Sequence, residues 1–225
     1  MSCSGHDKWD PQFVEKLLPL IQKDDLVLVY PQAREIKIDG TLGGVYQEDY
    51  TTTEIEKPAD RYLYVLKNIG MCNAVYSIWE TRSLKKCCLK PVIALDVLIL
   101  LSAALLGKFK QYSHPLFLRR TVREEYNDDM YPRQFRTITG KNSQKTPRTF
   151  FLKGQFIFEN IKMLYQIESK LSPLSKLNLS IQTIYVWVKK LYVRLFLINI
   201  LKKILPQKFY LFLENKLKDK IKKYL

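Results

Sequence analysis

One apolar segment, Asp96-Val-Leu-Ile-Leu-Leu-Ser-Ala-Ala-Leu-Leu106, limits the possible folds of this chain more than any other feature. Its residues favour a helix, and Gly107 follows as a stop signal. A helix that is apolar on nearly every side must be buried on most of its surface. The chain therefore has to supply further layers around residues 96–106.

Several short runs before and after this helix are typical of strands. Residues 26–30 (LVLVY) predict a strand buried in a parallel sheet, and residues 35–38 alternate in polarity up to an Asp39-Gly40 turn. Pro31 separates these two strands. Further strands are predicted at residues 72–79, 108–112 and 115–120.

Helical spacing is found between these strands. Residues 11–22 place apolar side chains on one face, with Asp10 as the N-cap and Pro11 at the first helical position. Further helices are predicted at residues 60–69 and 81–86, the second capped by Thr81. Residues 40–58 are polar and predict a mobile surface loop that covers a substrate site. Strands interspersed with helices indicate an α/β fold.

The charge is concentrated in the last third of the chain. The net charge is +15, and residues 151–225 hold 15 Lys and Arg against 4 Asp and Glu, whereas residues 1–150 hold 22 against 18. We expect a folded unit over residues 1–125, a polar linker over 126–149, and a basic amphipathic helical extension over 150–225 that breaks near Pro173.

The extension mixes lysines with aromatic and aliphatic residues, as helices at a membrane surface do. Its basic residues predict contact with an anionic membrane surface. Alternatively, it is a soluble helical hairpin with a solvated lysine face, or it binds nucleic acid, for which no groove-reading motif is present.

Three features indicate a cytoplasmic chain, peripheral to the inner face of the membrane. Residues 1–20 lack the pattern of a signal peptide, and no window of the sequence is apolar enough for a transmembrane helix. The four cysteines have neither zinc-ligand spacing nor a disulfide framework, so we expect reduced thiols (Cys3, Cys72, Cys87 and Cys88).

Five motifs follow one another along the chain. They are the loop Ser4-Gly5-His6-Asp7-Lys8 with Trp9-Asp10-Pro11-Gln12-Phe13, then Val27-Leu28-Val29-Tyr30-Pro31, Arg61-Tyr62 to Asn73-Ala74-Val75-Tyr76, Asp96-Val97-Leu98 to Leu106-Gly107-Lys108-Phe109, and Pro115-Leu116-Phe117-Leu118-Arg119-Arg120. In this order they resemble the second half of a family 2 glycosyltransferase of the GT-A type. The resemblance covers about residues 4–125 and implies a partial GT-A-like mixed sheet with flanking helices.

The resemblance implies transfer of a sugar from a nucleotide-diphosphate donor to a hydroxyl of a saccharide or lipid-linked acceptor, with inversion, in surface polysaccharide synthesis. Asp96 matches the general base, and Asp7 matches the last aspartate of an Asp-x-Asp loop that binds Mg²⁺ or Mn²⁺. Gly5 stands where the first aspartate of that loop would be.

Each assignment has a plainer alternative. Asp96 could be an ordinary acid at a helix start, and His6 could be a surface residue rather than a second metal ligand. Trp9 could stack on a sugar ring or pack in the core, and Asn73 could contact the acceptor. Arg119 and Arg120 could bind phosphate or form a solvated strand end.

Such enzymes carry a nucleotide-binding half before the acidic loop, and here only Met1-Ser2-Cys3 precede it. The expected explanations are a truncated product, a second polypeptide that supplies the missing half, or loss of that half together with activity. The alternative function is therefore a non-catalytic remnant or an accessory membrane-associated protein.

Overall fold

The computed structural model describes residues 7–22, 26–90, 92, 94–120, 149–169 and 171–204. His6, the Asp24-Asp25 pair, most of the predicted linker and residues 205–225 lie outside the described residues. The statements below concern the described part of the chain.

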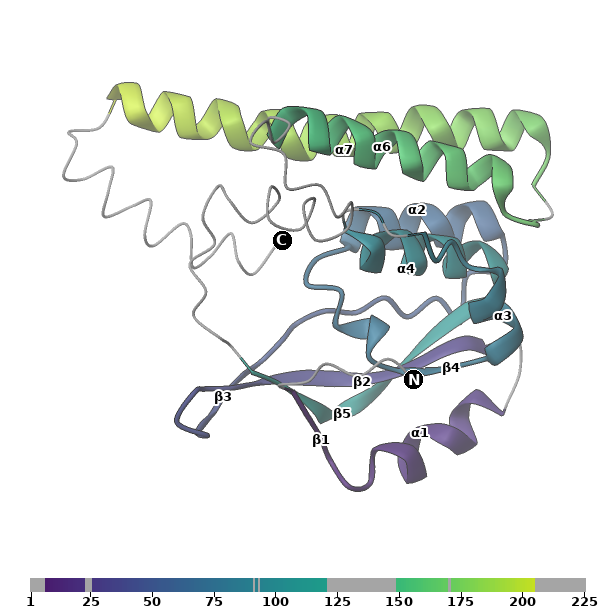
Figure 1. The fold of residues 1–225 in the computed structure, drawn as a ribbon, viewed down its shortest axis with the longest axis vertical. Coiled ribbons are helices and arrows are strands. Elements are labelled where there is room, and N and C mark those ends of the chain that lie inside the picture. The colour runs from purple at the N-terminus through teal and green to yellow at the C-terminus, as the bar shows by residue number, and fades with distance from the viewer. Residues whose placement is uncertain are drawn as a thin grey trace, which may run out of the picture.

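The centre of the fold is a mixed sheet built on two long parallel strands (Figure 1). β2 (Leu26–Ile36) pairs in parallel with β5 (Lys108–Arg120). Three short strands pair antiparallel with these two: β1 (Lys8–Trp9) with β5, and β3 (Leu42–Val45) and β4 (Ile78–Trp79) with β2. The path through the sheet is β1-β5-β2-β3.

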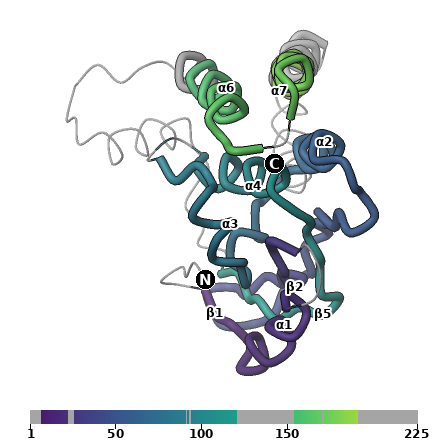
Figure 2. The backbone as a smooth tube through the Cα atoms, turned by 90° about the vertical axis from the view of Figure 1, so that its right-hand side faces the viewer, coloured from purple at the N-terminus to yellow at the C-terminus, as the bar shows by residue number. Residues whose placement is uncertain are grey.

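Helices cover the two faces of this sheet unequally (Figures 1 and 2). α1 (Phe13–Ile21) lies alone on one face, and α2 (Pro58–Asn68) and α4 (Leu95–Leu106) lie on the other. The turn η1 (Asn73–Val75) and α3 (Thr81–Lys86) connect α2 to α4. α6 (Thr149–Gln166) and α7 (Pro173–Ile204) form an outer layer over α2 and α4. The predicted α/β class, with a mixed sheet and flanking helices, is confirmed.

Two apolar clusters account for these layers. The smaller lies between α1 and the sheet and contains Phe13, Leu17 and Val29. The larger surrounds α4, where Leu98, Leu100 and Leu101 are fully buried. α4 runs from Leu95 to Leu106 with Gly107 after it, as predicted for this apolar helix.

The outer helices share the larger cluster rather than forming a core of their own. Leu164 of α6 and Leu179 of α7 are among its fully buried members. The Tyr62 hydroxyl of α2 hydrogen-bonds to Thr183 Oγ1 of α7 at 2.8 Å. Lys190 of α7 donates to carbonyls at the end of α2. Side chains up to Lys190 therefore pack against the sheet domain.

The prediction that Pro31 separates two strands was wrong, because β2 continues through it. The register against β5 shifts between Pro31 and Gln32, and such irregularities accommodate a residue without an N–H donor. β5 likewise continues through Pro115, which pairs with Gln32, so the two strands predicted over residues 108–120 are one.

The strand predicted over residues 72–79 is also wrong, except at β4. Cys72 has a left-handed backbone with φ 57°, and η1 follows it, so the chain turns here instead of extending. The indole Nε1 of Trp79 donates to the Val75 carbonyl at 3.1 Å and closes this turn.

The polar segment 40–58 is anchored rather than a free surface loop. Gly40 makes the predicted turn with φ 86°, and β3 follows. Tyr50 and Thr52 are fully buried. Thr52 exchanges two hydrogen bonds with the backbone of Phe109, one from each residue. The prediction of a mobile cover is therefore wrong for this part of the segment.

Two predicted helix caps are displaced. Asp10 accepts the N–H of Gln12 at 2.9 Å, but this turn precedes α1, which begins at Phe13. The carboxylate of Glu80, rather than Thr81, accepts the first N–H groups of α3. Across the described helices, none combines the length and apolar character required to cross a membrane.

Candidate active site

The candidate site lies where α4 begins and centres on Asp96. Its Oδ1 accepts the N–H of Val97 at 2.9 Å, and its carboxylate also contacts the thiol of Cys72. Burial raises the pKa of Asp96, against the opposing effects of these donors and of the positive charge of Arg119. A carboxylate with a raised pKa is a better proton acceptor than an exposed one.

Backbone strain is concentrated around this carboxylate. Among the described residues, two other than glycine have a positive φ, namely Cys72 at 57° and Ala94 at 54°. Cys72 contacts Asp96, and Ala94 is the N-cap of the helix that carries it. Residues in such conformations cost about 1–3 kcal/mol each and are frequent at functional sites.

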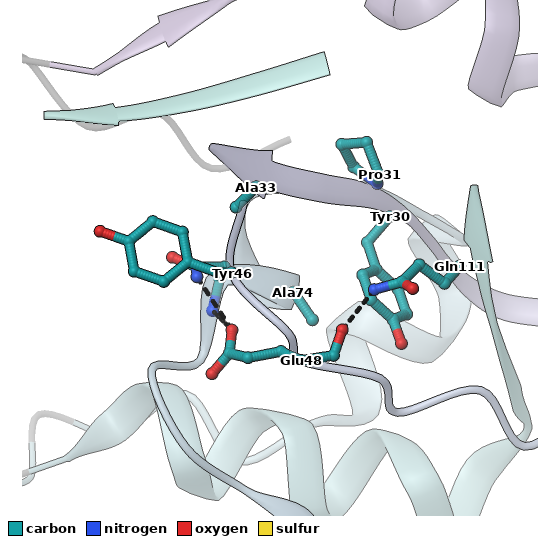
Figure 3. Close-up of a pocket in the computed structure, with 8 residues that line it drawn as sticks. Tyr30, Pro31, Ala33, Tyr46, Glu48, Ala74 and Gln111 are labelled. Carbon is teal, nitrogen blue, oxygen red and sulfur yellow. Dashed lines mark hydrogen bonds between the residues drawn. The ribbon is translucent and has the colours of Figure 1, made fainter. Parts of the chain in front are cut away.

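A second carboxylate, Glu48, organises the wall of the site (Figure 3). It accepts hydrogen bonds from Asn73 Nδ2 at 2.9 Å, from Asn73 N at 3.3 Å and from the Tyr50 hydroxyl at 2.9 Å. The backbone N–H of Met71 also donates to it. One side chain thus fixes the turn between α2 and η1.

Arg119 connects this wall to Asp96. Its Nη1 donates to Asn73 Oδ1 at 2.7 Å and to the Met71 carbonyl at 3.0 Å. Its positive charge acts on both Asp96 and Cys72. The result is a fixed guanidinium beside the partly buried carboxylate of Asp96. The guanidinium is held through a series of hydrogen bonds that runs from Glu48 through Asn73 to Arg119.

Asp7 reaches the same region from the other end of the sequence. It lies just before β1, and its Oδ1 accepts the backbone N–H of Arg120 at 2.8 Å. Burial raises the pKa of Tyr76, and the charges of Arg119, Asp7 and Asp96 all act on this phenol. The two predicted acids, 89 positions apart in sequence, therefore approach one tyrosine.

Two predicted binding residues, Trp9 and Arg120, make contacts within the fold. The half-buried ring of Trp9 packs on Phe117 with ring centroids 5.4 Å apart, and Phe117 stacks in turn on Tyr76 at 5.1 Å. The guanidinium of Arg120 lies 3.4 Å from the carbonyls of Lys37 and Ile38, at the turn after β2. Neighbouring strand residues point to opposite faces, so Arg119 and Arg120 diverge.

Asn73 is buried, and both ends of its side-chain amide are hydrogen-bonded: Nδ2 donates to Glu48, and Oδ1 accepts from Arg119. Its role in this geometry is to position Arg119. Beside it lies a cavity of about 10 Å³ (Figure 3), which is room for one water molecule at most. The residues that line the cavity are Tyr30, Pro31, Ala33, Tyr46, Glu48, Asn73, Ala74 and Gln111.

The described residues do not by themselves form a divalent-cation site. Within them, no group of three His, Cys, Asp or Glu side chains converges on one point. Asp7 offers a carboxylate that already accepts the N–H of Arg120, and His6 lies outside the described residues. One protein carboxylate is a thin ligand set for Mg²⁺ or Mn²⁺.

Sequence reasoning missed three residues of this site: Glu48, Cys72 and Tyr76. Glu48 stands in a polar segment without periodicity, where nothing marks it among its neighbours. Cys72 and Tyr76 fell within a predicted strand, and their spacing gave no sign of the turn that brings them to Asp96. The resemblance did place Asn73 and Tyr76 in one motif.

Comparisons of the chain with protein-family models, with curated proteins and with solved structures found no match.

Proposed function

We propose that this chain carries the acceptor side of a glycosyltransferase site, which transfers a sugar from a nucleotide-diphosphate donor to a hydroxyl with inversion. The observation that carries the proposal is Asp96: a carboxylate in the first turn of a buried helix, with a raised pKa and Arg119 beside it. The sequence motifs that resemble family 2 glycosyltransferases support the same assignment.

In this mechanism Asp96 accepts the proton of the acceptor hydroxyl as that oxygen attacks the anomeric carbon. Its position suits the task, because burial makes the carboxylate basic and the apolar helix α4 holds it rigidly. The bond from the anomeric carbon to the diphosphate breaks at the same time, and the diphosphate leaves with the electron pair.

Arg119 supplies positive charge close to this reaction. Its guanidinium is fixed by the Met71 carbonyl and Asn73, so little reorganisation is needed when negative charge develops nearby. Because the described residues do not form a cation site, no step of this mechanism is assigned to Mg²⁺ or Mn²⁺. Asp7 is assigned to the donor side of the site, where its carboxylate accepts the backbone N–H of Arg120.

The second candidate is a non-catalytic accessory protein. One observation favours it: the cavity beside Asn73 has room for one water molecule at most and is too small for a sugar, and the amide of Asn73 is already bonded to protein groups. In that case the strained Asp96 region is a remnant of an ancestral site.

Radiolabelled sugar transfer separates the two candidates. The full chain, without and with Mn²⁺, is given a panel of nucleotide-diphosphate sugars and bacterial lipid extract as acceptor. Asp96→Asn should lower transfer by about 10²–10⁴-fold, the usual contribution of a general base. Asp60→Asn is the matched control, since Asp60 is an exposed acid in the first turn of α2.

Equal transfer by wild type and Asp96→Asn would contradict the assignment of the base. Failure of the wild-type chain to bind any nucleoside diphosphate in calorimetry, with or without Mn²⁺, would favour the accessory protein.

A further inference from the structure

α7 has apolar residues on two opposite faces. Its inner face packs on the domain through Leu179, Thr183 and Trp187, and the Trp187 ring meets Phe156 edge-on at 4.8 Å. Its outer face carries a stripe of large apolar side chains that are between 37% and 76% exposed. This outer stripe consists of Leu174, Leu177, Ile181, Ile184 and Val188, with Tyr185 at its side.

α6 widens this surface. Phe158 and Tyr165 are 60% and 52% exposed, and they lie on the side of α6 away from its buried residues Phe156 and Met163. Figures 1 and 2 show α6 and α7 side by side as the outermost layer, with the sheet beneath α2 and α4. The outer face of the hairpin is thus a broad apolar surface with no covering element in the described chain.

The charge on α7 has one sign. Residues Pro173–Ile204 contain six basic residues and no Asp or Glu. Lys189 is exposed next to the stripe, whereas Lys190 turns inward to the carbonyls of Leu66 and Ile69 at the end of α2, 3.2 and 3.3 Å away. On α7 the apolar stripe therefore has basic residues and no acid of the same helix beside it, and such a stripe is complementary to an anionic surface.

We propose that the outer face of the α6–α7 hairpin lies on an anionic lipid bilayer, with the apolar stripe at the depth of the headgroups and Lys189 near lipid phosphates. The 3–4 spacing of the stripe would also suit a second helix. Two copies of α7, however, would bring lysines together with no acid on either helix to pair with them, and this disfavours a dimer through this face. The inference rests on the hairpin alone and is independent of the role of Asp96.

Vesicle flotation of the full chain tests this assignment. The wild-type chain should float with phosphatidylcholine vesicles that contain phosphatidylglycerol, and should float less at high salt or with phosphatidylcholine alone. The double variant Ile181→Glu with Ile184→Glu should lose binding by more than about tenfold, because it puts two carboxylates on the stripe. The matched control is Ile38→Glu with Leu42→Glu, two equally exposed apolar residues near β3, and it should bind as wild type does.

A second variant tests the proposal independently, in case the double glutamate variant does not fold. Lys189→Gln should weaken vesicle binding about fivefold, which corresponds to one basic residue at the bilayer surface. Wild-type chain that stays at the bottom of the gradient, or equal flotation of the stripe and control variants, would overturn the proposal. So would a dimer in sedimentation that Ile181→Glu with Ile184→Glu dissociates.

Discussion

The hydrogen bond between Tyr62 and Thr183 gives a quantitative test of how the C-terminal hairpin is joined to the domain. Both side chains are fully buried. Thr183 donates its own proton to the Leu179 carbonyl at 2.7 Å, so the Tyr62 hydroxyl must be the donor in the 2.8 Å contact between them. Thr183→Val therefore leaves a buried phenol donor without an acceptor.

An unpaired buried donor costs about 1–3 kcal/mol. For a chain of 225 residues, each kcal/mol lowers Tm by about 2–4 °C. Tyr62→Phe removes the donor and leaves Thr183 still bonded to Leu179, so it should cost less, about 1 kcal/mol. The double variant should be little worse than Thr183→Val, with a coupling free energy of about 1 kcal/mol.

The assay is urea unfolding of the wild type and the three variants, followed by circular dichroism and by tryptophan fluorescence. Additive single effects would refute the hydrogen bond. Two separate transitions, of which only one responds to these substitutions, would refute the shared core of α2 and α7. Leu174→Ser, which changes an exposed residue of α7, should leave the free energy of unfolding within about 0.5 kcal/mol of wild type.

Three further predictions concern the site and the packing of β3 on β2. Burial raises the folded-state pKa of Asp96, so the folded protein loses stability as pH rises from the unfolded-state pKa through the folded-state pKa. Asp96→Asn should therefore raise the urea midpoint at neutral pH. This gain should vanish at acid pH, where the wild-type acid is protonated in both states. Glu48→Gln should cost about 2 kcal/mol in the same assay, because a charged acceptor of several hydrogen bonds is lost, and an unchanged midpoint would contradict its central role. Gly43→Ala should lower the free energy of unfolding by about 1–3 kcal/mol, because an added Cβ would lie 2.8 Å from the Cβ of Glu35. Gly44→Ala is the control, since its added Cβ would enter open space. Equal thermal midpoints of the two variants would refute this contact.

The sequence predicted the elements in which the hydrophobic pattern alone decides structure. α4 was predicted within one residue at its start, because no other arrangement buries so many leucines. The apolar run at the start of β2 was identified as a parallel strand, since such strands are buried on both faces. In both cases the burial of apolar side chains dominates the free energy of folding of the element, and the apolar residue types can be read directly from the sequence.

The errors occurred where backbone hydrogen bonding decided the outcome. Pro31 was expected to end a strand, but a shift of register against β5 lets β2 continue. Residues 72–79 have the composition of a strand, and a left-handed residue at Cys72 overrides it. Neither effect depends on the local pattern of polarity, so neither could be predicted from it.

The candidate site was partly predictable, but not from the hydrophobic pattern. Asp96 was proposed as the base because the surrounding motifs resemble those of a known family, whereas its place at the start of a helix also fits an ordinary acid. The structure puts Arg119 in electrostatic reach of it. Glu48 could not be identified, because its importance comes from contacts made across the fold rather than from its neighbours in sequence. The polar residues that position a site are in general harder to recognise than the helix that carries it.

The order of synthesis gives the buried helix a vulnerable period. α4 is complete at Leu106, but α6, which packs against it, ends at Gln166, so the ribosome needs on the order of several seconds to supply this covering helix. During that time the apolar surface of α4 that α6 later covers is open to chaperones and to other nascent chains. We expect chains that terminate before Thr149 to aggregate or to be degraded. Docking of the hairpin is then the last folding step, after which chaperones no longer bind this surface.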